Sequence, residues 1–403
     1  MTVIVSSIGL KGLEGYRVQV EVRIRTGTES MVIVGLPDAS VKESRERVVA
    51  ALGHFDVDVT DQKVVVNLSP SEQKKNGPLF VNSPQKDFQH VIGHEQAKRA
   101  LEIAAAGEHN VLMSGPPGCG KSLLAETFPS ILPNLTNQAQ LEVMSLYQLA
   151  GERRIFHQNA PFRHPHHSAS SVAIIGGGST PRPGEISLAH RGVLFLDEIA
   201  EFTKKTIDML RQPLETGQVT ISRAHSTVTY PSNFILIGAM NPCPCGYLAS
   251  NHHYCTCSHK QIQAYRNRIS GPVYDRLDIL LPLQSINLDQ PSKRLESSND
   301  IRNRVEEARQ RQYQRYQTEV SNAKAPFEII TQTSPITSDQ QKMLTTVAVK
   351  KNWSNRVQIK IIRLARTISD LAGEDHITDT AIWEAMTLRR QGHHKQQSIA
   401  RET

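Results

Sequence analysis

The first part of the chain alternates between hydrophobic and polar positions, as strands with one buried face do. In YRVQVEVRI (16–24) every second residue is Val or Ile, which predicts a half-buried strand. The runs SMVIVGL and KVVVNL predict two further strands. Between them, DASVKESRERVVAALGHF has a polar first turn and an apolar stripe, and it predicts a helix. We therefore expect a small α+β domain over 1–68.

A different pattern follows a segment rich in Pro, Ser, Asn and Lys over 69–86, which reads as a linker. GHEQAKRALEIAAAGE has helical periodicity, and the short apolar runs NVLMS, GVLFLDE and FILIGAM have the character of buried strands. Strands that alternate with helices indicate a parallel α/β core, here over 87–283.

Strand patterns stop after about Leu283, and the remainder, 284–403, predicts a helical C-terminal domain. Ser338 and Thr378 have the side chains of helix N-caps. The expected helices lie near 298–317, 338–350, 354–372 and 378–390.

Composition narrows the class of protein. Of 403 residues, 38% are hydrophobic and 21% charged, as in globular proteins, and no apolar run approaches the ~18–20 residues of a membrane span. The first residues lack the basic head and apolar run of a signal peptide, so we expect a cytoplasmic protein with no membrane partner. The five cysteines, an odd number and mostly in one cluster, favour metal or local chemistry over a disulfide framework.

The net charge of +7 and the pI near 9.1 are compatible with a polyanionic partner without proving one. Five arginines fall between Arg302 and Arg315. They could contact DNA, or they could form a solvated helix face together with Glu306 and Glu307, and we favour the solvated face.

The segment GPPGCGKS has the spacing of a phosphate-binding P-loop, between a predicted strand and a predicted helix. Its backbone amides would cradle phosphate oxygens. Lys121 would neutralise charge on the β- and γ-phosphates of ATP, and Ser122 would bind Mg²⁺. The predicted nucleotide-binding residues of this loop are Gly115, Pro116, Pro117, Gly118, Cys119, Gly120, Lys121 and Ser122.

Two further strands end in polar residues. GVLFLDE ends in Asp197, which would hold Mg²⁺ through water, and Glu198, which would polarise the attacking water. FILIGAMN ends in Asn241, which is either a strand-terminating cap or a hydrogen-bond partner of the γ-phosphate or the lytic water. All three side chains would lie at the carboxyl edge of the sheet, where α/β proteins bind ligands.

These segments, with GAMNPC, SGPVYDRLD and SNRVQIKIIRLARTISDL, resemble the magnesium-chelatase-like branch of the AAA+ ATPases. VGLPDASVKESRERVVAAL and RQPLETGQVTISRA narrow the resemblance to the ComM/YifB family. It implies a hexameric ring with ATP between subunits. It also implies a DNA helicase that promotes branch migration during homologous recombination in natural transformation.

The resemblance carries roles onto matching residues. The P-loop would be Walker A, Asp197 and Glu198 would be Walker B, and Asn241 would be sensor 1. Arg276 in SGPVYDRLD would be the arginine finger, and Arg356 in SNR would be sensor 2. Alternatives for sensor 2 are Lys351, Arg363 and Arg366.

The N-terminal domain departs from the family pattern. In the family it resembles the Lon protease domain and is much longer than here. No Ser–Lys dyad is recognisable, so we do not expect proteolysis. Besides the helicase, two hypotheses of function remain. One is a chelatase-like motor that remodels a protein partner, and the other, less favoured, is a Lon-like protease.

Single-stranded and branched DNA are the expected partners, with other copies of the chain and recombination proteins. Two predicted strands flank Arg223 and His225, which would grip phosphates in the ring pore unless this is a plain surface hairpin. The family's insertion within helix 2 covers 162–192, and its histidines at 164, 166 and 167 suit packing or phosphate contact better than metal binding.

Two Cys-x-Cys pairs follow Asn241 within NPCPCGYLASNHHYCTCSH. Four sulfurs at this spacing predict a tetrahedral site for structural zinc, with Cys-x-Cys tighter than the usual Cys-x₂-Cys. The alternative is an ordinary loop with four reduced thiols, and nearby histidines could substitute as ligands. The predicted ligands are Cys243, Cys245, Cys255 and Cys257, with His252, His253 and His259 as substitutes.

Overall fold

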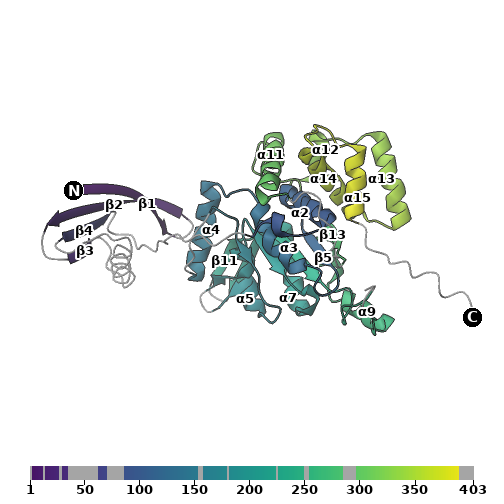
Figure 1. The fold of residues 1–403 in the computed structure, drawn as a ribbon, viewed down its shortest axis with the longest axis horizontal. Coiled ribbons are helices and arrows are strands. Elements are labelled where there is room, and N and C mark those ends of the chain that lie inside the picture. The colour runs from purple at the N-terminus through teal and green to yellow at the C-terminus, as the bar shows by residue number, and fades with distance from the viewer. Residues whose placement is uncertain are drawn as a thin grey trace, which may run out of the picture. The chain divides into compact units, whose positions relative to one another are not determined.

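A computed structural model describes most of the chain, and it divides into two compact units, residues 1–82 with 136–157 and residues 83–135 with 158–403 (Figure 1). The domain limits expected from the sequence stay predictions. None of the helices in the described part combines the length and apolar character needed to cross a bilayer. The described residues are 2–11, 14–26, 30–34, 62–69, 86–152, 158–178, 181–223, 226–248, 254–284 and 296–389.

The first unit contains a four-stranded sheet with the order β1-β2-β4-β3. Strands β1 and β4 both pair antiparallel with β2, and β3 pairs parallel with β4. The helix expected between β3 and β4 lies outside the described residues. Helix α4 begins after Thr136, whose hydroxyl accepts the Ala139 N–H. The elements are β1 (Thr2–Lys11), β2 (Glu14–Thr26), β3 (Ser30–Val34), β4 (Gln62–Ser69) and α4 (Asn137–Ala150).

Strand β1 was missed by the sequence analysis, and its pairing explains why. TVIVSSIGLK has no clean alternation of apolar and polar residues. It pairs with β2 along its whole length, from Thr2 opposite Arg23 to Lys11 opposite Glu14. Its conformation therefore follows from a neighbouring strand rather than from a local pattern.

The second unit is built on a parallel five-stranded sheet with the order β13-β5-β12-β9-β6. Strands β9 and β12 are buried at every position, as their apolar sequences predict. The predicted parallel α/β core is therefore confirmed, although β6 and β13 were not predicted. The strands are β5 (Val111–Ser114), β6 (Phe162–Arg163), β9 (Val193–Leu196), β12 (Ile235–Met240) and β13 (Ile279–Pro282).

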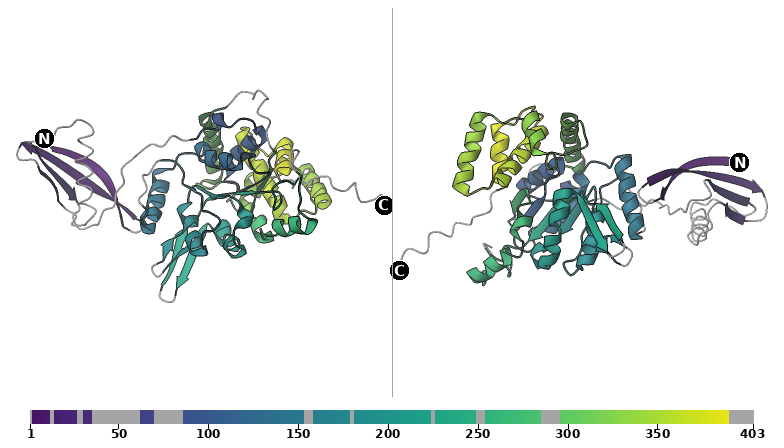
Figure 2. Two further views of the ribbon diagram at one scale, coloured as in Figure 1. Left: turned by 60° about the horizontal axis from the view of Figure 1, so that its bottom comes forward. Right: turned by 180° about the vertical axis from the view of Figure 1, so that it is seen from behind.

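Short helices and hairpins connect these strands. A hairpin of β10 (Gln218–Arg223) and β11 (Ser226–Pro231) projects from the unit (Figure 2). The remaining elements are η1 (Phe88–His90), α2 (Glu95–Gly107), α3 (Lys121–Thr127), η2 (Phe128–Ile131), α5 (Ser171–Ile175), β7 (Gly176–Gly177), β8 (Arg182–Pro183), α6 (Glu185–Leu188), η3 (Ile199–Glu201), α7 (Lys204–Met209), α8 (Arg211–Thr216), α9 (His259–Arg266) and α10 (Gly271–Tyr274).

The C-terminal region is helical, as predicted, and shares one hydrophobic core with the sheet (Figure 1). Helix α12 was not predicted. The N-cap of α13 is Thr337 rather than Ser338, because Thr337 and Gln340 form a reciprocal capping box. The helices are α11 (Ser298–Tyr316), α12 (Phe327–Thr333), α13 (Ser338–Lys351), α14 (Asn355–Leu371) and α15 (Asp379–Leu388).

The arginines of α11 do not form a solvated face, so that preference was wrong. Arg309 donates to the carbonyl oxygen of Ala105 at the end of α2, with its Nε at 3.0 Å. Arg302 donates to the Ser130 carbonyl. Carbonyls at a helix C-terminus attract cations. The arginines therefore fasten α11 to its neighbours.

A buried carboxylate organises the C-terminal helices. Asp370 is fully buried and pairs with Arg366, also fully buried, at 3.0 Å, and with Arg315. Its other oxygen accepts from the Asn322 amide at 2.8 Å. Buried charges persist only when they are paired and hydrogen-bonded in this way. Asp370 thus joins α11, α14 and the segment before α12.

Replacing Asp370 with Asn should lower the free energy of unfolding by about 3–5 kcal/mol, because it leaves buried guanidinium groups without their counter-charge. Chemical denaturation measures the change. Asp339→Asn is the control: its pair with Lys342 is exposed (89% and 77%), so it should cost less than about 1 kcal/mol. Equal losses in the two variants would contradict the role of Asp370.

Candidate functional site

The carboxyl ends of three adjacent strands carry the residues predicted to handle phosphate. β5 leads into the P-loop, β9 ends before Asp197, and β12 ends before Asn241. Because β12 pairs in parallel with both β5 and β9, these ends lie at one edge of the sheet. The structure therefore brings the three predicted segments together.

The P-loop has the backbone that its glycines predict. Gly118 and Gly120 have φ values of 75° and 84°, a region that side chains disfavour. A Cβ on Gly118 would meet no atom within 4 Å, so the loop is open there. At Gly115 a Cβ would lie 2.7 Å from the Leu283 carbonyl oxygen. The first glycine is thus needed for packing, while the later ones shape the cradle.

The Lys121 side chain folds back onto the P-loop. Its Nζ donates to the carbonyl oxygens of Gly115 at 2.7 Å and Pro116 at 2.9 Å, and to the Asn241 side-chain oxygen at 3.3 Å. The ammonium group is therefore held by acceptors that directly follow two neighbouring strands, β5 and β12. Phosphate oxygens are the acceptors for which such a group is suited.

Ser122 and Asp197 face each other, since the Ser122 hydroxyl donates to Asp197 Oδ2 at 2.9 Å. The second oxygen of Asp197 accepts the Glu198 N–H at 2.9 Å. Hydroxyl and carboxylate oxygens are the ligands Mg²⁺ prefers, so this pair fits the predicted ion. When bound, Mg²⁺ would neutralise phosphate charge.

Glu198 stands at the strand end in a left-handed conformation, with φ 48°. Its side chain is half exposed, and one oxygen lies 3.6 Å from Nδ1 of His167. The sequence analysis assigned His167 to packing or phosphate contact, and it did not expect this pairing. The partner comes from the insertion at 162–192, which no local pattern could place beside Glu198.

His94 is a second residue that the sequence analysis missed. It precedes α2 in a left-handed conformation, and a Cβ on Gly120 would lie 3.3 Å from its Nε2. Burial lowers the pKa of His94, against a raising hydrogen bond with the Cys119 backbone, so the neutral ring is favoured. In the sequence, the only signal for a residue at this place was the pair Gly93-His94 directly before a predicted helix.

The two predicted arginine roles stay predictions. Arg276 bonds within its own chain, to Glu215 and to the Pro272 carbonyl, both at 2.6 Å. Arg356 is exposed in the first turn of α14. Among its alternatives, Arg363 donates to the Ala323 and Ala325 carbonyls and Arg366 is buried, so these two have structural contacts.

The predicted strands around residues 224–225 are present as the hairpin β10–β11, with Arg223 opposite Ser226. His225 lies outside the described residues. The Tyr230 hydroxyl donates to the Pro181 carbonyl at 2.9 Å, which attaches the hairpin to the insertion. The two elements expected to meet DNA are therefore packed together.

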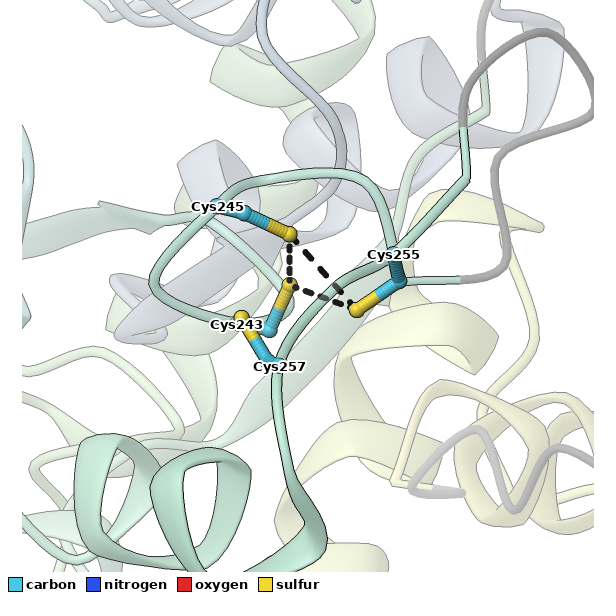
Figure 3. Close-up of side chains that lie close together, drawn as sticks. All are labelled: Cys243, Cys245, Cys255 and Cys257. Carbon is cyan, nitrogen blue, oxygen red and sulfur yellow. Dashed lines mark hydrogen bonds between the residues drawn. The ribbon is translucent and has the colours of Figure 1, made fainter.

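The four clustered cysteines converge as predicted, and Figure 3 shows their side chains meeting. Their sulfurs all lie within 4.8 Å of one another, and three pairs are 3.3, 3.7 and 3.5 Å apart. Four sulfurs around a tetrahedral zinc, each at ~2.3 Å, are roughly 3.8 Å apart. The donors thus fit Zn²⁺. Of the substitute ligands, His252 and His253 lie outside the described residues, and His259 begins α9.

Comparison with known proteins shows the family to which this chain belongs. The family model "Magnesium chelatase, subunit ChlI" matches residues 87–290, about half of the chain. Its C-terminal companion, "Magnesium chelatase, subunit ChlI C-terminal", matches residues 295–389. A third, "Subunit ChlI of Mg-chelatase", matches residues 20–81.

Individual relatives agree. YifB of Salmonella typhimurium is 43% identical over 309 residues, covering 75% of this chain and 60% of that protein. Competence protein ComM of Haemophilus influenzae is 41% identical over 323 residues, covering 78% and 62%. The chain thus spans about three fifths of the length of these relatives.

A Mycobacterium bovis protein is 28% identical over 496 residues, covering 96% of this chain and 98% of the relative. That alignment exceeds the 403 residues of this chain, so the relative has internal segments that are missing here. The matches extend from the N-terminal sheet to α15. The chain belongs to the magnesium chelatase subunit ChlI family of AAA+ proteins, in its ComM/YifB group.

Proposed function

We propose that this chain is an ATPase that drives a hexameric DNA helicase in branch migration during homologous recombination in natural transformation. One observation carries the ATPase part: at one edge of the sheet Lys121 donates to Asn241, and the neighbouring Ser122 donates to Asp197. The name of the Haemophilus relative, competence protein ComM, supports the link to transformation.

The chemistry assigns a task to each side chain. Lys121 would neutralise negative charge on the phosphates, and Ser122 with Asp197 would hold Mg²⁺. Glu198, whose side chain is half exposed, would accept a proton from the attacking water. Asn241, already bonded to Lys121, orients that water or the γ-phosphate.

A neighbouring subunit would complete the site. Arg276 is the proposed finger, and in the single chain Glu215 holds its guanidinium group. Ring assembly would exchange this carboxylate for the neighbour's γ-phosphate, a more highly charged partner. Arg356, exposed at the start of α14, would contact nucleotide as sensor 2.

The hairpin β10–β11 and the insertion around α5 and α6 would hold DNA. Arg223 ends β10 next to the turn of this hairpin, and we expect it and His225, two residues later in the sequence, to contact phosphate, which would give affinity without base specificity. Residues 1–68 would be a shortened Lon-protease-like domain. Cytoplasmic location, and recombination proteins as further partners, belong to the same proposal.

The second candidate is a chelatase-like motor that remodels a protein partner. The family description, magnesium chelatase subunit ChlI, favours it. A Lon-like protease is a weaker alternative, because the N-terminal segment has no recognisable Ser–Lys dyad. DNA dependence of ATP turnover separates the first two.

Asp197→Ala should weaken binding of ATP in the presence of Mg²⁺ by about tenfold or more while leaving Mg²⁺-free binding unchanged, because it removes a ligand of the ion. Titration with a fluorescent ATP analogue, with and without Mg²⁺, measures both. The control Asp339→Ala alters an exposed carboxylate of α13. Equal binding by Asp197→Ala and wild type in Mg²⁺ would refute the assignment.

Glu198→Gln should bind ATP normally and hydrolyse it about 10²–10⁴-fold more slowly, because the base is lost. It should also stop branch migration on a three-strand DNA intermediate. Glu319→Gln, an exposed carboxylate after α11, is the control. If wild-type ATP turnover ignores DNA and a protein partner stimulates it, the helicase proposal fails in favour of the remodelling motor.

A further inference from the structure

We infer that the four-cysteine centre binds Zn²⁺ and that this metal holds the P-loop and Asn241 in the shape that accepts nucleotide. The inference that Zn²⁺ binds depends only on the cysteines. The inference that zinc affects nucleotide binding, the coupling, rests on the proposed ATP site. Together they make the metal centre a determinant of nucleotide affinity rather than a distant structural clip.

The metal would cross-link the two ends of one loop. Cys243 and Cys245 lie just after β12, and Cys255 and Cys257 lie just before α9. Cys243 is fully buried, and the other three are half-buried. Thiolate sulfur at tetrahedral spacing selects Zn²⁺ among the common divalent ions. Closing a loop in this way reduces the conformations open to the backbone between the pairs.

One side of this loop lies against the P-loop. Gly246, beside Cys245, has φ 83°, and its N–H donates to the Cys243 carbonyl at 3.0 Å. A Cβ added at Gly246 would lie 2.8 Å from both Cδ and Cγ of Pro117. The turn that carries the first cysteine pair therefore packs directly on the phosphate-binding loop.

The other side reaches Asn241. Ser258, next to Cys257, caps α9 in a reciprocal box with Gln261. In the last turn of α9, the buried Tyr265 hydroxyl accepts a hydrogen bond from the Asn241 backbone. Asn241 in turn accepts from Lys121. The second cysteine pair thus fixes the start of a helix whose far end positions Asn241.

These contacts give the metal a specific effect. Without it, only weak thiol contacts hold the sulfurs together, and the turn at Gly246 can move away from Pro117. The P-loop and Asn241 then lose a rigid neighbour on each side. A cradle that must be ordered on binding has lower affinity than a preorganised one.

The first test measures metal and nucleotide on the same protein. Chain purified under reducing conditions should contain about one zinc per chain by elemental analysis, consistent with a four-sulfur site. Removing zinc with a selective chelator in excess Mg²⁺ should weaken binding of a fluorescent ATP analogue by about tenfold or more. Added Zn²⁺ should restore binding. Circular dichroism checks that the chelated chain remains folded.

The second test breaks the contact and keeps the metal. Gly246→Ala should retain zinc and yet bind the ATP analogue more weakly, because its methyl group collides with Pro117. The matched control is Gly373→Ala, which has a similar φ of 80° but follows α14 and should keep wild-type affinity. This pair separates the contact from general strain of a left-handed residue.

Each outcome decides one part. Absence of zinc from the reduced protein overturns the metal centre. Zinc present, with nucleotide affinity unchanged by chelation and in Gly246→Ala, overturns the coupling. A zinc-loaded wild-type chain without affinity for ATP instead overturns the proposed ATPase, and with it the coupling, and leaves the metal centre supported.

Discussion

The register of the central sheet depends on the hydrogen bonds of one residue, Asn110, directly before β5. Its side-chain oxygen accepts the Leu236 N–H of β12 at 2.8 Å, and its amide nitrogen donates to the Arg276 carbonyl at 3.2 Å. Its backbone carbonyl accepts the N–H groups of Asp278 and Ile279, at the start of β13. One nearly buried side chain therefore sets where three parallel strands begin, and so where their functional ends meet.

The same place joins the sheet to the C-terminal helices. Asp278 accepts from the Asn110 backbone at 2.9 Å and pairs with Lys360 of α14 at 2.6 Å. Burial by itself raises the pKa of Asp278, but Lys360 and His109 together outweigh burial and hold the pKa far below its ordinary value. Arg276 lies two residues before Asp278 in the sequence, and Arg356 lies one turn before Lys360 on α14. This ion pair therefore attaches α14 to the segment that carries Arg276.

Local sequence was sufficient to predict the functional segments whose residues are adjacent in the chain. The P-loop spacing, the strand ending in Asp197 and the apolar run before Asn241 each predict their own element, because the strand, turn and helix signals adjoin. The cysteine spacing likewise predicted the convergence seen in Figure 3. Prediction failed where a partner comes from elsewhere in the chain. Strand β1 needs β2, His167 meets Glu198 across the fold, and the arginines of α11 find carbonyls of α2.

The sequence by itself therefore determined the class of the core, the family and the residues available for phosphate and metal. These depend on patterns of a few adjacent residues, whose backbone preferences act locally. Tertiary structure alone decided that Gly246 lies on Pro117 and that α11 faces inward. Both follow from which surfaces become buried together, and hydrogen bonds and van der Waals contacts between distant segments leave no periodicity in the chain.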